Sequence, residues 1–186
     1  MWHLLKQWDR DLFVYLNSLG IERYDGVWIA ITQPITWIPL YLLFAFLIFR
    51  YFKGRDATRI ISFLLLTLGT TVVLGNLTKY FVARLRPSNV PEWADLIRIL
   101  QTPSNYSFFS GHAATSFAVT TFIVLVFRRF SNWAYLIYIW PVLFALSRIY
   151  VGVHYPSDII VGALVGSGLA IVFYQVGVKT KAKEKG

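Results

Sequence analysis

The sequence predicts an all-α protein: a polytopic membrane helical bundle of five transmembrane helices, preceded by an N-terminal interfacial amphipathic helix. Of its 186 residues, 56% are hydrophobic and 15% charged, whereas soluble proteins carry roughly a quarter charged residues. The mean hydropathy of +0.55 agrees with this class. In addition, apolar segments long enough to cross a bilayer alternate with short basic segments.

The excess of basic residues has a simple explanation in a membrane protein. The formal net charge is +9, and the cations stand in short runs between apolar segments. Such runs are typical of positive-inside loops, so we expect no nucleic-acid partner. The chain has no cysteine, which excludes disulfides, thiolate nucleophiles and cysteine-based metal sites.

The first 81 residues are predicted to form one surface helix and two spans. Residues 1–20 place tryptophans and leucines at helical spacing among polar residues, as an interfacial helix does. Residues 27–49 form the first span, with kinks expected at Pro34 and Pro39. Residues 60–81 form the second, and its polar later half is expected to face protein.

A long connection over residues 82–110 follows the second span. Apolar residues from Trp93 to Leu100 recur at helical spacing, which predicts a short helix on the membrane surface. Connections of this length are often functional, so we expect it to border the active site. Arg84 is expected to contact a lipid head group or to be an ordinary surface cation.

Three further spans are predicted at residues 113–127, 133–150 and 159–178. Pro141 predicts a second kink site, and Gly162, Gly166 and Ala170 recur every four residues, which permits close helix packing. The whole chain is expected to be one domain, residues 1–186.

The distribution of cations predicts the topology. Five spans place the loops after the first and third spans on the same side as residues 179–186. These segments hold ten of the eighteen Lys and Arg residues, so we expect this side, with the tail, to be cytoplasmic. The 82–110 connection then lies on the extracytoplasmic side with the turn between the last two spans.

Several unusual polar groups are predicted to meet on that side. Lys79, Arg86 and Arg148 are cations at the ends of spans, and such a cluster repels itself unless an anion joins it. Ser110 and Gly111 stand where a helix begins, and free N–H groups at a helix start bind anions. Both observations indicate phosphate.

Histidine and aspartate add reactive groups to this anion site. Pro156 suits the first turn of the last helix, which leaves His154 just before it and Asp158 inside it. Asp158 could accept the imidazole N–H and leave the other nitrogen free to attack. His112 could protonate a leaving oxygen. This set suits phosphoryl transfer without a metal ion.

Three motifs in this region resemble those of the type 2 phosphatidic acid phosphatase (PAP2) superfamily of integral-membrane lipid phosphatases. The segments are Lys79-x6-Arg86-Pro87, Ser110-Gly111-His112 and Ser147-Arg148-x5-His154-x3-Asp158, in the family's order. The second motif commonly begins with a proline, where this chain has Phe109.

The resemblance implies a role for each motif residue. His154 would be the nucleophile that forms a phosphohistidine, Asp158 would orient it, and His112 would protonate the leaving group. The phosphoryl oxygens would be held by Lys79, Arg86, Ser110, Gly111 and Arg148. The resemblance implies no metal and no cofactor, and we expect no obligate protein partner.

The substrate stays open at the level of the sequence. By analogy with the family we expect undecaprenyl diphosphate, hydrolysed at the periplasmic face of a bacterial inner membrane. Phosphatidylglycerol phosphate, phosphatidic acid and lipid A are the alternatives. A non-catalytic lipid-phosphate binding or transport protein is the rival from another class, and vanadate-dependent halide oxidation is a third possibility.

Overall fold

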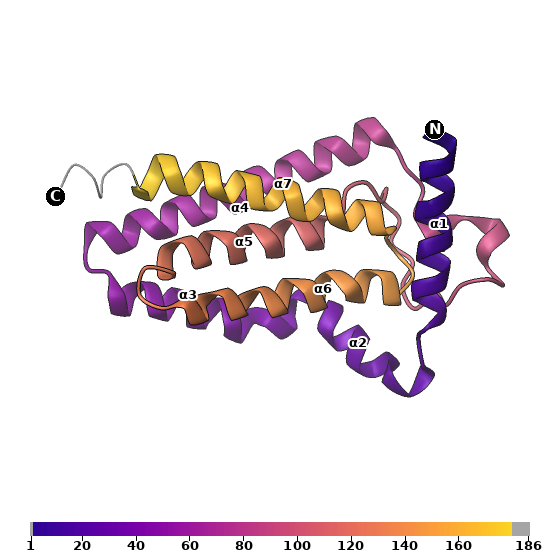
Figure 1. Cartoon of the computed structure of the whole chain (residues 1–186), viewed down its shortest axis with the longest axis horizontal. Coiled ribbons are helices and arrows are strands. Elements are labelled where there is room, and N and C mark those ends of the chain that lie inside the picture. The colour runs from indigo at the N-terminus through magenta and orange to yellow at the C-terminus, as the bar shows by residue number, and fades with distance from the viewer. Residues whose placement is uncertain (1, 180–186) are drawn as a thin grey trace.

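The computed structural model describes residues 2–179, and these fold into a helical bundle without a β-strand in that range. The α-helices are α1 (Trp2–Ser18), α2 (Asp25–Thr32), α3 (Ile38–Tyr51), α4 (Arg55–Val82), α5 (Gly111–Phe127), α6 (Ile139–Tyr150) and α7 (Pro156–Tyr174). Helices α3 to α7 run along the long axis, and α1 lies across one end (Figure 1). From α3 to α7, consecutive helices run in opposite directions (Figure 1). The predicted fold class is confirmed.

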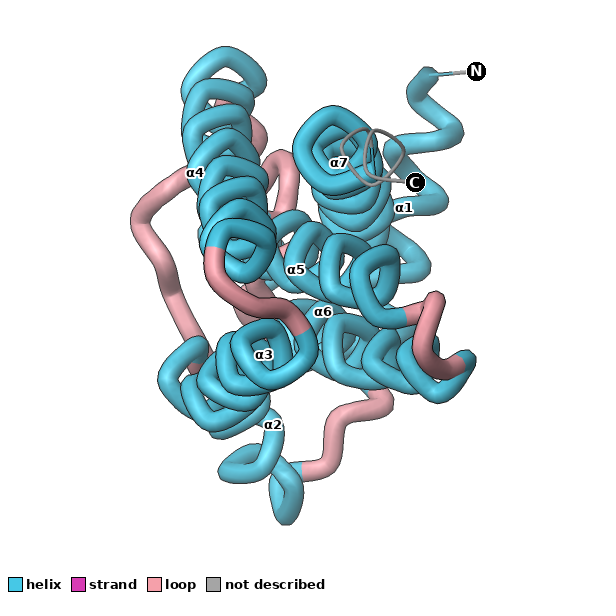
Figure 2. The backbone as a smooth tube through the Cα atoms, turned by 90° about the vertical axis from the view of Figure 1, so that its left-hand side faces the viewer, coloured by secondary structure: helices cyan, strands magenta, loops and turns pink. Residues whose placement is uncertain are grey.

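Helix α5 occupies the middle of the bundle, with α4, α6 and α7 around it (Figure 2). Eleven of its 17 residues are buried, as expected of a helix that other helices surround. Within residues 2–179, four helical segments are long and apolar enough to cross a membrane, and they begin at Pro34, Arg55, Asn132 and Pro156. Helix α5 is an apolar helix of 17 residues.

The small residues of α7 bring it against α5. A Cβ atom on Gly166 would collide with the carbonyl oxygen of Ala114, and one on Gly162 would lie 2.7 Å from that of Ser110. The predicted close packing at Gly162 and Gly166 is therefore confirmed. It brings the N-terminal ends of α5 and α7 side by side, where the backbone N–H of Ser110 donates to the carbonyl of Asp158 (2.9 Å).

The first span is not one kinked helix, which corrects the prediction for residues 27–49. Gln33 is extended (φ −83°, ψ 126°) and separates α2 from a 3-10 turn at Pro34–Trp37 and from α3. Proline disfavours the helical conformation in the residue before it, so the chain breaks there. Helix α2 diverges from the bundle (Figure 1). Pro39 lies in the first turn of α3, where proline is tolerated.

The surface helix predicted within residues 82–110 is also absent. The segment holds only the 3-10 turns Pro87–Asn89 and Pro91–Trp93. Its later backbone groups bond to other segments: the N–H of Leu100 donates to the carbonyl of Val151 (3.2 Å), and that of Arg98 donates to the Asn17 side chain (2.7 Å). The regular spacing of apolar residues from Trp93 onward instead reflects their packing against α1, where Trp93 stacks on Phe13.

Two other expectations are refined. The fourth span begins as a 3-10 helix at Asn132–Tyr138, so Pro141 lies in the first turn of α6 and not at a kink within it. Helix α7 continues as one π-helical turn over Gln175–Lys179. The expected cytoplasmic tail lies outside the described residues apart from Lys179.

Candidate active site

Three segments meet at the end of the bundle that α1 crosses. They are the end of α4 with the connection after it, the start of α5, and the end of α6 with the turn and the start of α7 that follow it (Figure 1). Antiparallel helices place these ends together because α4 and α6 run toward this end, while α5 and α7 begin there. All eight residues singled out from the sequence belong to these three segments.

His154 and Asp158 form a buried pair at the centre of this end. The distance from Nδ1 of His154 to Oδ2 of Asp158 is 3.3 Å, and their side chains are 1% and 0% exposed. Asp158 is the third residue of α7, and its Oδ2 also accepts the backbone N–H of Tyr155 (3.1 Å). Gly152 makes the preceding turn with φ +82°, where a Cβ would lie 2.6 Å from the carbonyl oxygen of Arg98.

Arg86 closes over the other side of the imidazole. Its Nη1 lies 3.0 Å from Nε2 of His154 and also donates to the carbonyl of Val153 (3.0 Å). Its Nε and Nη2 donate to the backbone and side-chain oxygens of Asn105, at 2.8 and 2.6 Å. A guanidinium only donates, so Nε2 must be the acceptor, and this assigns the ring proton to Nδ1, facing Asp158.

The surroundings of His154 favour its neutral form. Burial holds the pKa of the imidazole well below its usual range, and the charges of Arg86, Arg148, Lys79 and Arg84 lower it further. A neutral ring with its proton on Nδ1 keeps a lone pair on Nε2. That is the state a nitrogen nucleophile requires.

Two more cations lie close by. Arg148, in the last turn of α6, is 4% exposed; its Nη1 donates to the hydroxyl of Thr32 and to Oε1 of Gln101 (3.1 Å). Its Nε is buried and has no partner among residues 2–179. Lys79 makes no ion pair in that range, and it repels both Arg86 and Arg148. This surplus of positive charge is what an anionic ligand would relieve.

The start of α5 supplies backbone donors and a second imidazole. Ser110 is the N-cap residue, and its Oγ accepts the N–H of Ala113 (3.4 Å). Beside Gly111 the space is open, since a Cβ there would meet nothing within 4 Å. The His112 ring packs near Phe144, with centroids 5.1 Å apart, and lies within electrostatic range of Arg148, His154 and Lys79.

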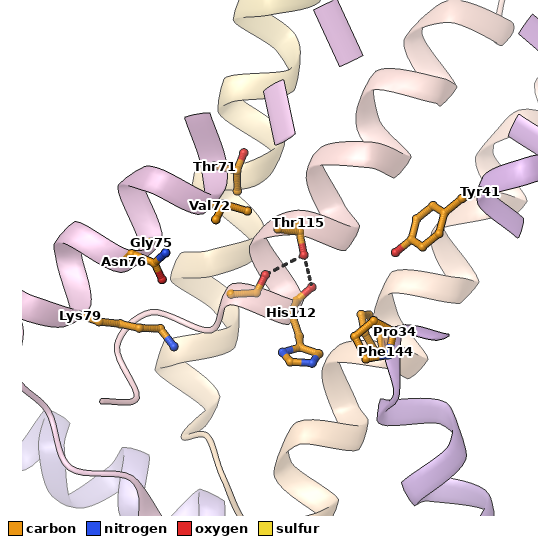
Figure 3. Close-up of a pocket in the computed structure, with 11 residues that line it drawn as sticks. Pro34, Tyr41, Thr71, Val72, Gly75, Asn76, Lys79, His112, Thr115 and Phe144 are labelled. Atoms are coloured by element: carbon orange, nitrogen blue, oxygen red, sulfur yellow. Dashed lines mark hydrogen bonds between the residues drawn. The ribbon is translucent and has the colours of Figure 1, made fainter. Parts of the chain in front are cut away.

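A cavity of about 240 Å³ adjoins His112, between α4, α5, α6 and the start of α3. The side chain of Lys79 extends from α4 toward the His112 ring of α5, and both residues line the cavity (Figure 3). Its lining residues are Pro34, Tyr41, Thr71, Val72, Gly75, Asn76, Lys79, Gly111, His112, Thr115 and Phe144. Of the predicted site residues, Lys79, Gly111 and His112 therefore line the cavity. His154, Asp158 and Arg86 are buried and do not line it.

Several residues of the site carried no sequence signal. Arg84 is not the ordinary surface cation that the sequence allowed: its side chain is 24% exposed, and its Nη1 is 2.8 Å from Oδ1 of Asp158. Asp9 on α1 pairs with the same guanidinium. Thr32, Gln101 and Asn105 hold the motif arginines. The one available signal is that Arg84 lies two residues before the motif residue Arg86, which places it near the site.

Residues 2–179 contain no group of three or more His, Cys, Asp or Glu side chains placed to hold a metal ion. The polar groups that converge at the site are instead cations, imidazoles, a carboxylate and the free N–H groups of a helix start, a set suited to phosphate chemistry.

Comparison with known proteins agrees with this geometry. The sequence pattern of the PAP2 superfamily matches residues 60–182. This chain belongs to the PAP2 superfamily. The match includes all three motifs and confirms both the resemblance and the predicted enzyme class, a phosphatase.

Relatives and a solved structure extend the likeness to most of the chain. A lipid A 4'-phosphatase of Bacteroides thetaiotaomicron is 30% identical over 98% of this chain and 83% of its own length. An undecaprenyl-diphosphatase of Sulfolobus acidocaldarius is 33% identical over 89% of this chain and 77% of its own. The crystal structure of a PAP2-type phosphatidylglycerolphosphate phosphatase from Bacillus subtilis superposes with a TM-score of 0.75, at 24% identity, covering 95% of this chain and 87% of that one.

Proposed function

We propose that this PAP2 protein removes a phosphate group from a membrane lipid through a phosphohistidine on Nε2 of His154. The observation that carries the proposal is the orientation of His154, whose Nδ1–H faces Asp158 and whose Nε2 faces Arg86. A binding protein needs cations for phosphate, but it does not need an imidazole held in one tautomer by a buried carboxylate.

The proposed reaction has two steps. The Nε2 lone pair attacks phosphorus, and Arg86 exchanges the imidazole for a phosphoryl oxygen as the bond to the leaving oxygen breaks. His112, which must be protonated when the anionic substrate is bound, gives its second proton to that oxygen. In the second step, His112 takes a proton from water, which attacks the phosphohistidine and releases phosphate and a neutral His154.

Charge stabilisation falls to the remaining site residues. Lys79, Arg86 and Arg148 hold the equatorial oxygens, together with the free N–H groups at the start of α5 beside Ser110 and Gly111. Asp158 stabilises the positive charge that develops on the imidazole during attack. Every step uses groups of this chain and water.

A membrane lipid is the substrate class that the surroundings favour. The cavity beside His112 lies between membrane-spanning helices, so a lipid head group can reach it while the tail stays in the bilayer. Relatives are named as phosphatases of lipid A, undecaprenyl diphosphate and phosphatidylglycerophosphate. We retain undecaprenyl diphosphate as the first candidate, with lipid A, phosphatidylglycerol phosphate and phosphatidic acid as the alternatives.

Phosphate release from these four lipids, in chelator-treated buffer, tests the proposal. We expect the purified wild type to release phosphate from at least one of them, and His154→Gln to release none. If His154→Gln were as fast as the wild type, the nucleophile assignment would be wrong. Binding of a lipid phosphate without any turnover would favour the non-catalytic alternative.

The proposed location is a bacterial inner membrane, with the site on the periplasmic face and the C-terminus in the cytoplasm. This orientation is supported by the Lys and Arg residues at the end of the bundle away from the site, in the loops after the first and third predicted spans and in residues 179–186. Because the chain lacks cysteine, a single Cys at position 182 can be labelled with a membrane-impermeant maleimide. Labelling from outside intact cells would overturn the orientation.

A further inference from the structure

Arg84 divides its guanidinium between two carboxylates from opposite ends of the sequence. Its Nη1 lies 2.8 Å from Oδ1 of Asp158 on α7, and its Nη2 lies 2.7 Å from Oδ2 of Asp9 on α1. The guanidinium also lies over the ring of Tyr155, 3.7 Å from its centroid. These three contacts fix the plane of the fork, so that only one of its arms reaches Asp158.

Asp9 is bound further to the start of α7. Its Oδ1 accepts the backbone N–H of Ser157 (2.8 Å), and its Oδ2 lies 2.5 Å from the Ser157 hydroxyl. That N–H belongs to the first turn of α7, where N–H groups lack a partner within the helix and a carboxylate is favourable. Asp9 thus caps the helix that carries Asp158, although 148 residues separate it from Ser157.

We propose that Asp9 and Arg84 are positioning residues for the Asp158–His154 pair, through which helix α1 sets the orientation of the nucleophile. The proposal rests on the phosphatase function proposed above and extends it to two residues outside the motifs. Neither residue is required to touch the substrate.

The reason lies in how the oxygens of Asp158 are shared. Arg84 occupies Oδ1, which leaves Oδ2 for Nδ1 of His154 and for the N–H of Tyr155. Without Asp9, the second arm of Arg84 would lose its partner. A guanidinium beside one carboxylate prefers to bind both oxygens. The resulting two-point contact would draw Oδ2 away from the imidazole and loosen the ring.

A purely structural role for Asp9 makes a different prediction. Asn17, also on α1, anchors the helix without touching the pair: its Nδ2 donates to the carbonyls of Arg98, Ile149 and Tyr150 at 3.0 to 3.1 Å. Asn17→Ala is therefore the matched control, which weakens the docking of α1 and leaves Arg84 and Asp158 in place.

The experiment compares wild type, Asp9→Asn, Asn17→Ala, Asp158→Asn and the double variant Asp9→Asn/Asp158→Asn in lipid nanodiscs. We measure kcat and KM on p-nitrophenyl phosphate, the affinity for vanadate as a phosphoryl analogue, and the thermal midpoint. Asp9→Asn should lower kcat about ten- to a hundredfold with KM nearly unchanged, as misplacement of a reacting group does. Asn17→Ala should lower the thermal midpoint and keep kcat within about twofold of wild type.

The double variant separates positioning from stability. If Asp9 acts through Asp158, adding Asp9→Asn to Asp158→Asn costs little further activity. An equal loss of kcat in both backgrounds, or an unchanged kcat in Asp9→Asn, would overturn the proposal. If Asp9→Asn does not fold, Ser157→Ala carries the same comparison, because it removes one contact of Asp9 and one of Arg84.

The outcome for wild type distinguishes the two proposals. An active wild type with an unaffected Asp9→Asn overturns only the positioning role. A wild type that neither hydrolyses phosphate esters nor binds vanadate overturns the phosphatase proposal, and the positioning role with it.

Discussion

Nη1 of Arg86 lies 3.0 Å from Nε2 of His154, so the motif arginine occupies the lone pair of the proposed nucleophile. The same arginine is 3% exposed and is anchored by Asn105. In this arrangement the attacking nitrogen is reached only when Arg86 exchanges it for another acceptor, and a phosphoryl oxygen is a stronger one.

Replacement of Arg86 tests this exchange. Arg86→Lys keeps the charge but loses the planar fork that binds Asn105 and the imidazole together, so we expect kcat/KM to fall about a hundredfold. Added guanidinium should restore part of the activity of Arg86→Ala, because the small cation can enter the vacated space. The control is His154→Gln, which guanidinium should not rescue. Wild-type kcat/KM in Arg86→Lys would contradict the role assigned to the fork.

A change at His112 should separate the two chemical steps. p-Nitrophenolate is a good leaving group and needs little protonation, so His112→Gln should still transfer phosphate to His154. Hydrolysis of the phosphohistidine still needs a base. We expect an acid-labile, base-stable phosphoenzyme to accumulate from labelled p-nitrophenyl phosphate in His112→Gln. Its absence there, with wild-type turnover, would remove His112 from the mechanism.

Loss of the Asp158 carboxylate should affect turnover more than binding. Asp158→Asn presents an amide to Nδ1 and favours the wrong tautomer, which costs about four orders of magnitude in kcat in a Ser-His-Asp enzyme. A loss of at least a thousandfold in kcat, with vanadate affinity reduced less, is the expected result. A drop confined to KM would argue that Asp158 only shapes the pocket.

The buried His154 predicts a pH dependence of stability. Burial lowers its pKa in the folded state, so on acidification the unfolded chain binds the proton first. Above about pH 6.5, His154 is neutral in both states and does not change the free energy of unfolding. Below that pH, the unfolded state is favoured by its protonation, and the free energy of unfolding falls by at most about 1.4 kcal/mol per pH unit. The thermal midpoint of wild type should fall more between pH 7 and 5 than that of His154→Gln, in which the other titrating groups are the same. Parallel curves would contradict the prediction.

Two glycines on α7 form a matched pair for the packing. A Cβ on Gly166 would meet the Ala114 carbonyl, whereas one on Gly168 would meet nothing within 4 Å. Gly166→Ala should therefore destabilise the protein by about 1–3 kcal/mol. Gly168→Ala should be neutral or slightly stabilising, because alanine favours helix. Thermal unfolding in detergent measures both, and equal effects would show that α5 and α7 do not pack as described.

The helices and the motif residues are predictable from local patterns. Long apolar runs need backbone hydrogen bonds satisfied within each segment, which makes α4 and α7 nearly certain from composition. The spacing from Arg148 through His154 to Asp158 indicates the chemistry because one turn and one helix start place all three. Pro34 explains the break at Gln33 once the structure is known. From the sequence alone, a proline within a span can either kink a helix or end it.

By itself, the sequence determined the class, a membrane helical bundle, and the eight candidate site residues, because hydrophobic runs and motif spacing are properties of neighbouring positions. Only the tertiary structure decided which partners hold those residues: Asn105 on Arg86, Thr32 on Arg148, and Asp9 with Arg84 behind Asp158. These contacts join residues up to 116 positions apart, such as Thr32 and Arg148. Polar side chains so far apart in the sequence show no spacing signal, since their proximity depends on where α1 and the connection pack against the ends of α6 and α7.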